Sequence, residues 1–181
     1  SYREAVALGP EAAEVADNLR FHLARTHLFA GTYDEAEALM REHLAYRSAS
    51  RGDRHLDTAF AMRELGTTLA LQEKFAESRQ QLEAALQIQL KTLPPGSREV
   101  LDTRNELATT FYRAGDLATA EAQWLALAED GSRYLGDSHS LTISALGNAA
   151  TTLRRRGEFT RALPLAKRAM EAEARMPDVS P

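Results

Sequence analysis

The chain has 181 residues, an apolar fraction of 44%, a charged fraction of 27% and a formal net charge of −4. These values are typical of a soluble protein with one core or one short repeat array, and the lack of cysteine excludes disulfides, thiolate nucleophiles and cysteine-based zinc sites. No apolar run approaches the ~20 residues that a membrane span requires, and no strongly basic domain argues for nucleic-acid binding.

One nine-residue phrase recurs along the chain at a constant interval. It reads GTYDEAEAL at 31–39, EKFAESRQQ at 73–81, GDLATAEAQ at 115–123 and GEFTRALPL at 157–165, each 42 residues after the one before it. Apolar residues at i and i+4 before each phrase indicate one buried stripe on a helix. A glycine then ends that helix, and the aromatic residue or leucine after it starts another. The pattern predicts helix–turn–helix units that must stack to bury their stripes.

The predicted elements follow from this period in chain order. The first helices of the units are expected at 11–29, 55–71, 98–113 and 139–155, and the second helices at 33–50, 75–91, 117–134 and 159–175. Small residues in two columns would let paired helices approach closely; they are Ala24, Gly66, Ala108 and Ala150, and Ala36, Ser78, Ala120 and Ala162.

We expect the whole chain, 1–181, to form a single all-α repeat domain that is part of a longer protein. Its units are expected at approximately 11–52, 53–94, 95–136 and 137–176, and the last residues, 176–181, look like a frayed tail.

Several positions depart from the repeat pattern. Glu73 stands where the other units have glycine, so its turn should be strained or re-routed. Pro164 falls just inside the last helix, where a first turn would tolerate it. His27 and His43 replace apolar core residues in the first unit, whereas Trp124 occupies an inward-facing column and should be a core anchor.

The columns L-A/G…G-x-Y/F-x-x-A resemble those of tetratricopeptide repeats, whose usual period is ~34 residues. The longer period resembles the variant found in kinesin light chains and in many bacterial regulators. That variant carries a G-D/P-x-H-P-x-T loop, which is matched here by GDRHLDT (52–58) and GDSHSLT (136–142). The resemblance implies a right-handed superhelical solenoid of four repeats. It further implies a cytoplasmic, non-catalytic scaffold that binds a protein or peptide in its concave groove, as a sensor or interaction module of a larger bacterial signalling protein.

Catalytic and metal-binding motifs are not evident. His55 and His139 lie two periods apart in equivalent turns, so we expect them to bond local backbone rather than share a metal. Ser97 and Ser138 could cap the helices that follow them. We find no nucleophile motif, P-loop or dinucleotide-binding glycine cluster. We therefore expect neither an enzyme nor a cofactor, although a cofactor bound to purified protein would revive the enzyme hypothesis.

The first helices of such repeats line the concave face, and their exposed columns mix amide, hydroxyl, aromatic and guanidinium groups. Such a mixture suits the backbone and side chains of an extended peptide. The carboxylate clamp of chaperone-binding relatives is absent, because acidic residues such as Glu64, Asp102 and Glu106 stand where cations would be. The last 31 residues hold seven basic and four acidic groups, so we expect an acidic or polar partner. The candidate peptide-binding residues are Arg63, Asn105, Thr109, Tyr112, Arg113, Asn148, Arg154 and Arg155.

Two interpretations of these residues stay open. The arginines Arg113, Arg154 and Arg155 could instead complement helix C-termini. The chain could also be a self-associating module that forms a homodimer through its final helix, because an uncovered end of a repeat array exposes apolar surface. The apolar residues of that helix are Leu163, Leu165, Ala166, Ala169 and Met170.

Overall fold

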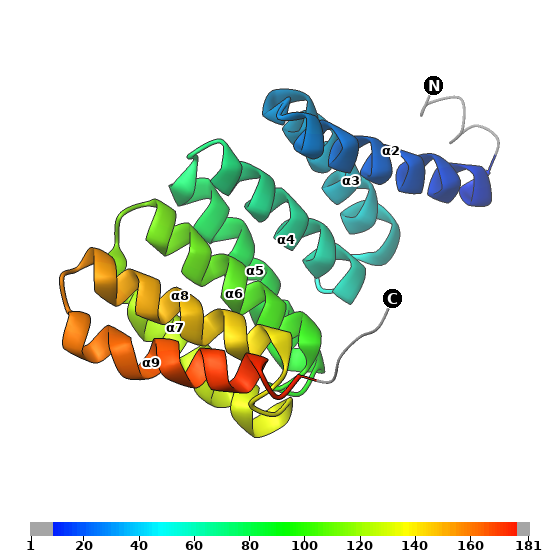
Figure 1. Ribbon diagram of the computed structural model, residues 1–181. Helices are drawn as coiled ribbons and strands as arrows, with labels where there is room; N and C mark the ends of the chain where they lie inside the picture. The colour runs from blue at the N-terminus through cyan, green and yellow to red at the C-terminus, as the bar shows by residue number, and fades with distance from the viewer. Residues whose placement is uncertain (1–8, 177–181) are drawn as a thin grey trace. The chain divides into compact units, whose positions relative to one another are not determined.

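The computed structural model describes residues 9–176, which form eight helices and no strand (Figure 1). The helices are α2 (Pro10–Ala30), α3 (Tyr33–Arg51), α4 (Leu56–Leu71), α5 (Phe75–Thr92), α6 (Arg98–Arg113), α7 (Leu117–Tyr134), α8 (Ser140–Arg155) and α9 (Phe159–Glu173). Every end lies within two residues of the position expected from the period, so the all-α helical-repeat fold is confirmed. The expected tail falls mostly outside the described residues.

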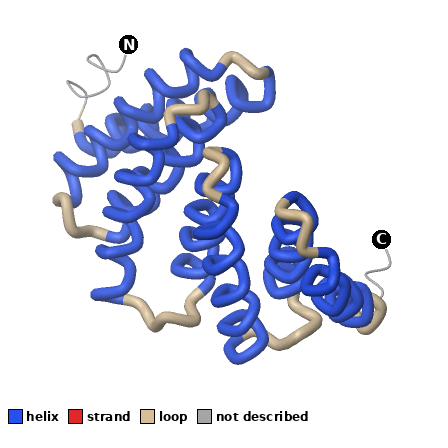
Figure 2. The backbone as a smooth tube through the Cα atoms, turned by 90° about the vertical axis from the view of Figure 1, so that its left-hand side faces the viewer, coloured by secondary structure: helices blue, strands red, loops and turns tan. Residues whose placement is uncertain are grey.

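The chain divides into two compact units, residues 1–88 and 89–181, with the boundary inside α5. In the first unit, α3 packs against both α2 and α4. In the second unit, α7 packs against α6 and α8, and α8 packs against α9 (Figure 1). Short loops join consecutive helices, as Figure 2 shows in tan, because each helix turns back on the one before it.

The two columns of small residues are buried at helix crossings, as predicted. Ala24, Ala36, Ala108 and Ala120 have no exposed surface. Gly66 shows why size matters, because a Cβ atom there would lie 2.7 Å from Cγ of Leu82. Side chains larger than hydrogen at Gly66 would therefore push α4 and α5 apart.

The turn between paired helices uses the same backbone conformation in all four repeats. Gly31, Gly115 and Gly157 have φ angles of 77°, 85° and 79°, and Glu73 keeps this geometry with φ 63°. The expected strain at Glu73 is therefore present, since a Cβ atom is disfavoured in the left-handed region.

Two of the three loops between repeats are held by histidine. His55 and His139 are the N-caps of α4 and α8, and their Nδ1 atoms accept hydrogen bonds from the backbone N–H groups of Asp57 (3.1 Å) and Leu141 (3.2 Å). The local role predicted for both histidines is confirmed. The cap predicted at Ser138 is wrong, because His139 caps α8. Ser97 occupies the N-cap position of α6 as predicted, but its side chain makes no capping hydrogen bond there.

Pro164 lies in the interior of α9, six residues into a helix that starts at Phe159. The prediction that it occupies the first turn is wrong. At this depth an amide N–H would donate to the carbonyl of Thr160, and proline has no N–H to donate. The last helix therefore contains one missing hydrogen bond.

Candidate functional site

Seven of the eight predicted binding residues belong to the second unit. There the ring of Tyr112 contacts both an aromatic ring and a guanidinium group. Its ring centroid lies 5.5 Å from that of Trp124 on α7, with the planes tilted by 58°. The guanidinium carbon of Arg155, on α8, lies 4.6 Å from the Tyr112 centroid. Three helices thus bring an aromatic pair and a cation together. We call Asn105, Tyr112, Trp124 and Arg155 the Tyr112 cluster.

Trp124 fixes the base of this cluster. It is 3% exposed and packs in a core that includes Ala145, Leu146 and Ala149 of α8, which confirms its predicted role as a core anchor. Its indole Nε1 donates to Oδ1 of Asn105 at 3.2 Å. Asn105 therefore accepts a bond from the core, and its amide nitrogen makes no hydrogen bond to the described residues.

The other polar candidates on these helices bond mainly to their own backbone. The Thr109 hydroxyl donates to the carbonyl oxygen of Asn105 at 2.9 Å. The backbone carbonyl of Asn148 accepts from the Thr152 hydroxyl at 2.7 Å. The half-buried side chain of Asn148 makes no hydrogen bond within residues 9–176, which leaves its amide able to pair with a ligand.

The three candidate arginines of the second unit differ in their surroundings. Arg113 and Arg155 are exposed and form no ion pair within the described part of the chain. Arg154 borders an open groove between α8 and α9. Arg156 and Arg161, by contrast, both pair with the buried carboxylate of Glu121. Arg113 and Arg155 are thus able to pair with an acidic ligand, whereas Arg156 and Arg161 already have acidic partners.

The ion pairs of Arg161 are strong enough to affect its titration. Hydrogen bonds to Glu158 and Glu121 raise the pKa of the Arg161 guanidinium above its ordinary value. Because both carboxylates already engage this arginine, it is poorly suited to recruit a further anion.

Arg63 is the candidate that belongs to the first unit. Its guanidinium carbon lies 5.2 Å from the Phe60 ring centroid, and its Nη2 atom is 2.8 Å from the carboxylate of Glu64. Arg63 is therefore already neutralised by its neighbour.

A cavity in the first unit was missed by sequence reasoning. It measures about 420 Å³, and its lining residues come from α2, α3 and α4, with Asp57 and Phe60 on α4. The signal that could have revealed it is the pair Asp17 and His43, which stand in columns that the later repeats fill with apolar residues. The full lining is Glu14, Asn18, Phe21, His22, His43, Arg47, Asp57 and Phe60.

Metal ligands and membrane spans were also sought among residues 9–176. No group of three or more histidine, aspartate or glutamate side chains there could hold a metal ion. No described helix combines the length and the apolar character needed to cross a bilayer.

Comparison with known proteins gives the family through one sequence model and the fold through solved structures. The tetratricopeptide-repeat model matches residues 13–91 and 99–172. A solved structure of a Podosopora anserina protein named as a kinesin light chain, with nearly identical TPR-like repeats, is 20% identical, covers 90% of this chain and 77% of its own, and gives a TM-score of 0.78. BtubC (BKLC) from P. vanneervenii is 21% identical, covers 99% and 72%, and gives 0.80. No curated protein matches the chain.

Proposed function

Because the chain belongs to the tetratricopeptide-repeat family, whose fold generally mediates contacts between proteins, we propose that it is a non-catalytic scaffold for an acidic partner segment. The partner binds across α6 and α8 of the second unit. The observation that carries this proposal is the Tyr112 cluster, where Arg155 lies over the ring of Tyr112, and α6 also carries the exposed and unpaired Arg113.

The cluster offers three kinds of contact to an extended peptide. Guanidinium groups bind carboxylates through two parallel hydrogen bonds, so Arg113 and Arg155 favour aspartate or glutamate. The amide nitrogen of Asn105 and the side-chain amide of Asn148 can form hydrogen bonds with the peptide backbone. The Thr109 hydroxyl can do the same if it rotates away from the carbonyl of Asn105. Arg154 extends the positive surface toward α9.

The test measures binding of fluorescent twelve-residue peptides that are either acidic or neutral. We expect an acidic peptide to bind the native chain, and Arg113→Ala with Arg155→Ala to weaken it about tenfold or more at low salt. The loss should shrink as salt rises, because exposed charges are screened. The matched control is Arg133→Ala with Arg175→Ala, which removes two exposed arginines elsewhere.

Equal binding of acidic and neutral peptides would contradict the proposal. So would equal losses in the two double variants, because net charge rather than the cluster would then decide affinity. Circular dichroism checks that both variants fold.

We further propose a cellular role. In this proposal the module lies in the cytoplasm and is the sensor or interaction part of a bacterial signalling protein. A chain without cysteine fits a reducing compartment, and the 42-residue period is shared with bacterial regulators. Expression of a tagged chain in a bacterium, followed by fractionation, tests the location.

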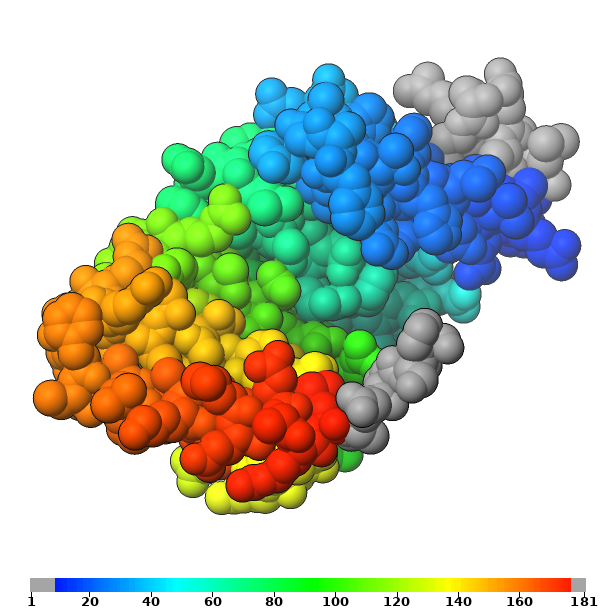
Figure 3. Space-filling view, in the orientation of Figure 1, coloured from blue at the N-terminus to red at the C-terminus, as the bar shows by residue number. Residues whose placement is uncertain are grey.

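A second candidate function is self-association through the groove between α8 and α9. Three apolar side chains there are largely exposed: Phe159 (65%), Leu163 (57%) and Met170 (69%). The groove holds about 630 Å³, and Figure 3 shows α9 on the visible surface of the second unit, in orange and red. The groove is also lined by Ala162, Ala166 and Ala169. One repeat earlier, their equivalents Ala120, Trp124 and Leu127 belong to the core that α7 forms with α8. A helix from a second copy would cover the groove in the same way.

Light scattering coupled to size-exclusion chromatography decides this second function. A homodimer that dissociates when Leu163 and Met170 are changed to glutamate supports it. A monomer at every concentration removes it and leaves the peptide-binding proposal unaffected.

A further inference from the structure

The first unit contains a buried polar network that its fold does not require. The Asp17 carboxylate, which has no exposed surface, accepts hydrogen bonds from Arg20 Nη1 and His43 Nδ1, each at 2.9 Å, and lies 2.9 Å from Arg47 Nε. His43 is 2% exposed. Both side chains come from helices that pack together, Asp17 on α2 and His43 on α3.

In the later repeats, the positions equivalent to Asp17 and His43 hold apolar residues. The column of Asp17 continues as Ala59, Leu101 and Ile143, and that of His43 as Ala85, Leu127 and Ala169. Buried charged groups lose their hydration and seldom stabilise a protein more than well-packed apolar residues would. A polar pair confined to the first repeat therefore calls for an explanation other than stability.

One atom of this network has no partner. His43 Nε2 is buried and makes no hydrogen bond. A carboxylate can only accept, so Nδ1 must donate to Asp17, and in the neutral imidazole Nε2 then carries a free lone pair. A buried acceptor without a donor is costly, and a ligand that brings an O–H or N–H group would remove that cost.

The imidazole lines the cavity of about 420 Å³ between α2, α3 and α4. Its Nδ1 edge faces Asp17, which is not part of the lining, so Nε2 lies on the other edge of the ring. Aromatic rings form the neighbouring wall. The centroid of the Phe21 ring lies 5.1 Å from that of His43 and 5.5 Å from that of Phe60, and the planes of the two phenyl rings meet at 62°.

Guanidinium groups surround these phenyl rings. Arg25 lies 5.9 Å from the Phe21 centroid, and Arg63 lies 5.2 Å from that of Phe60. Arginine near the wall disfavours a cationic ligand and favours an electron-rich ring. The rim carboxylates Glu14 and Asp57 are already paired with Arg51.

We infer that this cavity binds a tyrosine side chain of the partner protein, with its phenol O–H donating to His43 Nε2 and its ring packed against Phe21 and Phe60. Because Nε2 is buried in the free chain, one of these half-exposed rings turns aside when the tyrosine enters. The inference rests on the proposed function only in taking a protein as the partner. It concerns different residues, and its test uses no peptide.

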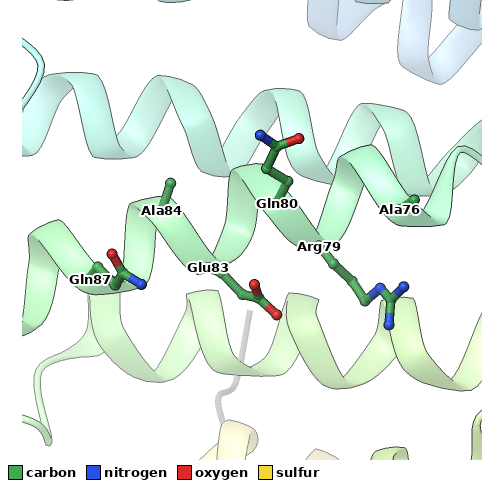
Figure 4. A pocket seen from close by; sticks show the side chains of 6 residues that line it. All are labelled: Ala76, Arg79, Gln80, Glu83, Ala84 and Gln87. Atoms are coloured by element: carbon green, nitrogen blue, oxygen red, sulfur yellow. The ribbon is translucent and has the colours of Figure 1, made fainter.

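A second depression in the same unit lacks the features that would hold a tyrosine side chain. It lies along α5 alone, where Arg79 and Glu83 point to one side of the helix and Gln80 to the other (Figure 4). It has no aromatic wall among its lining residues and no enclosing second helix. The cavity beside His43 has both.

The test is an NMR titration of the chain with N-acetyl-tyrosinamide, N-acetyl-phenylalaninamide and N-acetyl-lysinamide. We expect the tyrosine amide to bind about tenfold more tightly than the phenylalanine amide, which is the worth of one good hydrogen bond. The ring ¹⁵N signal of His43 Nε2 should move with the tyrosine amide and not with the phenylalanine amide.

Two variants assign the effect to His43. Asp17→Ala with His43→Ala recreates the Ala59–Ala85 pair of the second repeat and should abolish the preference for tyrosine. His22→Ala removes the other imidazole of the lining and should keep it. Equal affinity for the tyrosine and phenylalanine amides, or tighter binding of the lysine amide, would overturn the inference. If the double variant does not fold, the His43 ring signal of the native chain decides alone. Failure here leaves the predictions for Arg113 and Arg155 standing.

Discussion

At the scale of single residues, the molecule departs from its own repeat at a few defined positions. Glu73 adopts a conformation that glycine fills in the other three repeats. The equivalent glycines have open space where a Cβ atom would point, so the cost at Glu73 arises from backbone conformation rather than from a clash. Each departure of this kind therefore has an effect on stability that can be measured separately.

The first prediction concerns this turn. Glu73→Gly should raise the free energy of unfolding by about 1 kcal/mol, because relief of the left-handed strain outweighs the greater freedom of glycine in the unfolded chain. Thermal and urea denaturation measure the change. The matched control, Gly115→Ala, should destabilise by a similar amount, and an unchanged or lower melting temperature in Glu73→Gly would count against the argument.

The second prediction concerns Glu37 on α3, which pairs with Lys74 (2.6 Å) and Arg41 (2.8 Å). Burial alone would raise the pKa of Glu37, but the hydrogen bonds from Lys74 and Arg41 outweigh it and lower the pKa below 4.5. A lowered carboxyl pKa stabilises the fold above the unfolded pKa, and that contribution is lost as pH falls through the folded pKa.

Glu37→Gln should therefore be less stable than the native chain at pH 7, and the difference should shrink as the pH falls from the unfolded pKa through the lowered folded pKa of Glu37. Urea denaturation between pH 3 and pH 7 measures it. Glu35→Gln, which removes an exposed carboxylate of the same helix, is the control for loss of one charge. A difference that is constant with pH would show that the ion pair is not its source.

At the scale of secondary structure elements, several helix ends have an identifiable chemical cause. His55 and His139 supply the N-caps of α4 and α8, and glycine or Glu73 ends the first helix of each repeat. α9 contains a departure in its interior, because Pro164 interrupts its hydrogen bonding while the helix continues to Glu173. Its packing on α8 must therefore compensate for the missing bond.

The third prediction is that Pro164→Ala stabilises the chain. Interior proline costs a helix up to ~3 kcal/mol, and part of that is offset by the restricted unfolded chain, so we expect a gain of about 1–2 kcal/mol. Denaturation measures it, and helicity from circular dichroism should not fall. Lys167→Ala, at another exposed position inside α9, controls for helix propensity. A loss of stability on replacing Pro164 would mean that the proline ring makes contacts worth more than the bond.

At the scale of the whole molecule, the chain consists of two compact units, each with its own core. The core of the second unit is the larger, and it is built around Trp124 and the helices on either side of it. The core of the first unit is smaller and shares its interior with the Asp17–His43 network. The two units should therefore respond separately to damage in one core.

The fourth prediction is that Trp124→Ala destabilises by about 3–5 kcal/mol, as expected for truncation of a buried aromatic residue. Hydrogen exchange should accelerate in α6, α7 and α8 and change less in α2, α3 and α4. Leu82→Ala, which opens a cavity beside α4, should show the opposite pattern. Uniform acceleration in both variants would mean that the chain unfolds as one cooperative unit.

The fold was largely predictable from the sequence, whereas the site was predictable only in part. The period and the turn residues located all eight described helices, because each local signal repeats four times. The contact of Arg155 with Tyr112 was not predictable in detail, since it depends on the rotation of α8 on α6. The cavity beside His43 was missed because a histidine in an apolar column resembles a simple irregularity of the repeat. Its hydrogen bond to Asp17, which is 26 residues away in the sequence, becomes evident only in the structure.

The histidine-capped loops bear on how the repeats were duplicated. Ser48 with Asp53, and Thr58 with the carbonyl of Gly52, recur 84 residues later as Ser132 with Asp137, and Thr142 with Gly136. The loop between these two copies, at 94–100, is proline-rich and lacks the motif. This alternation of loops is the pattern that duplication of a pair of repeats, rather than of a single repeat, would produce. A descendant lengthened by 84 residues would keep two kinds of loop in strict alternation, whereas one lengthened by 42 would place two loops of the same kind in succession.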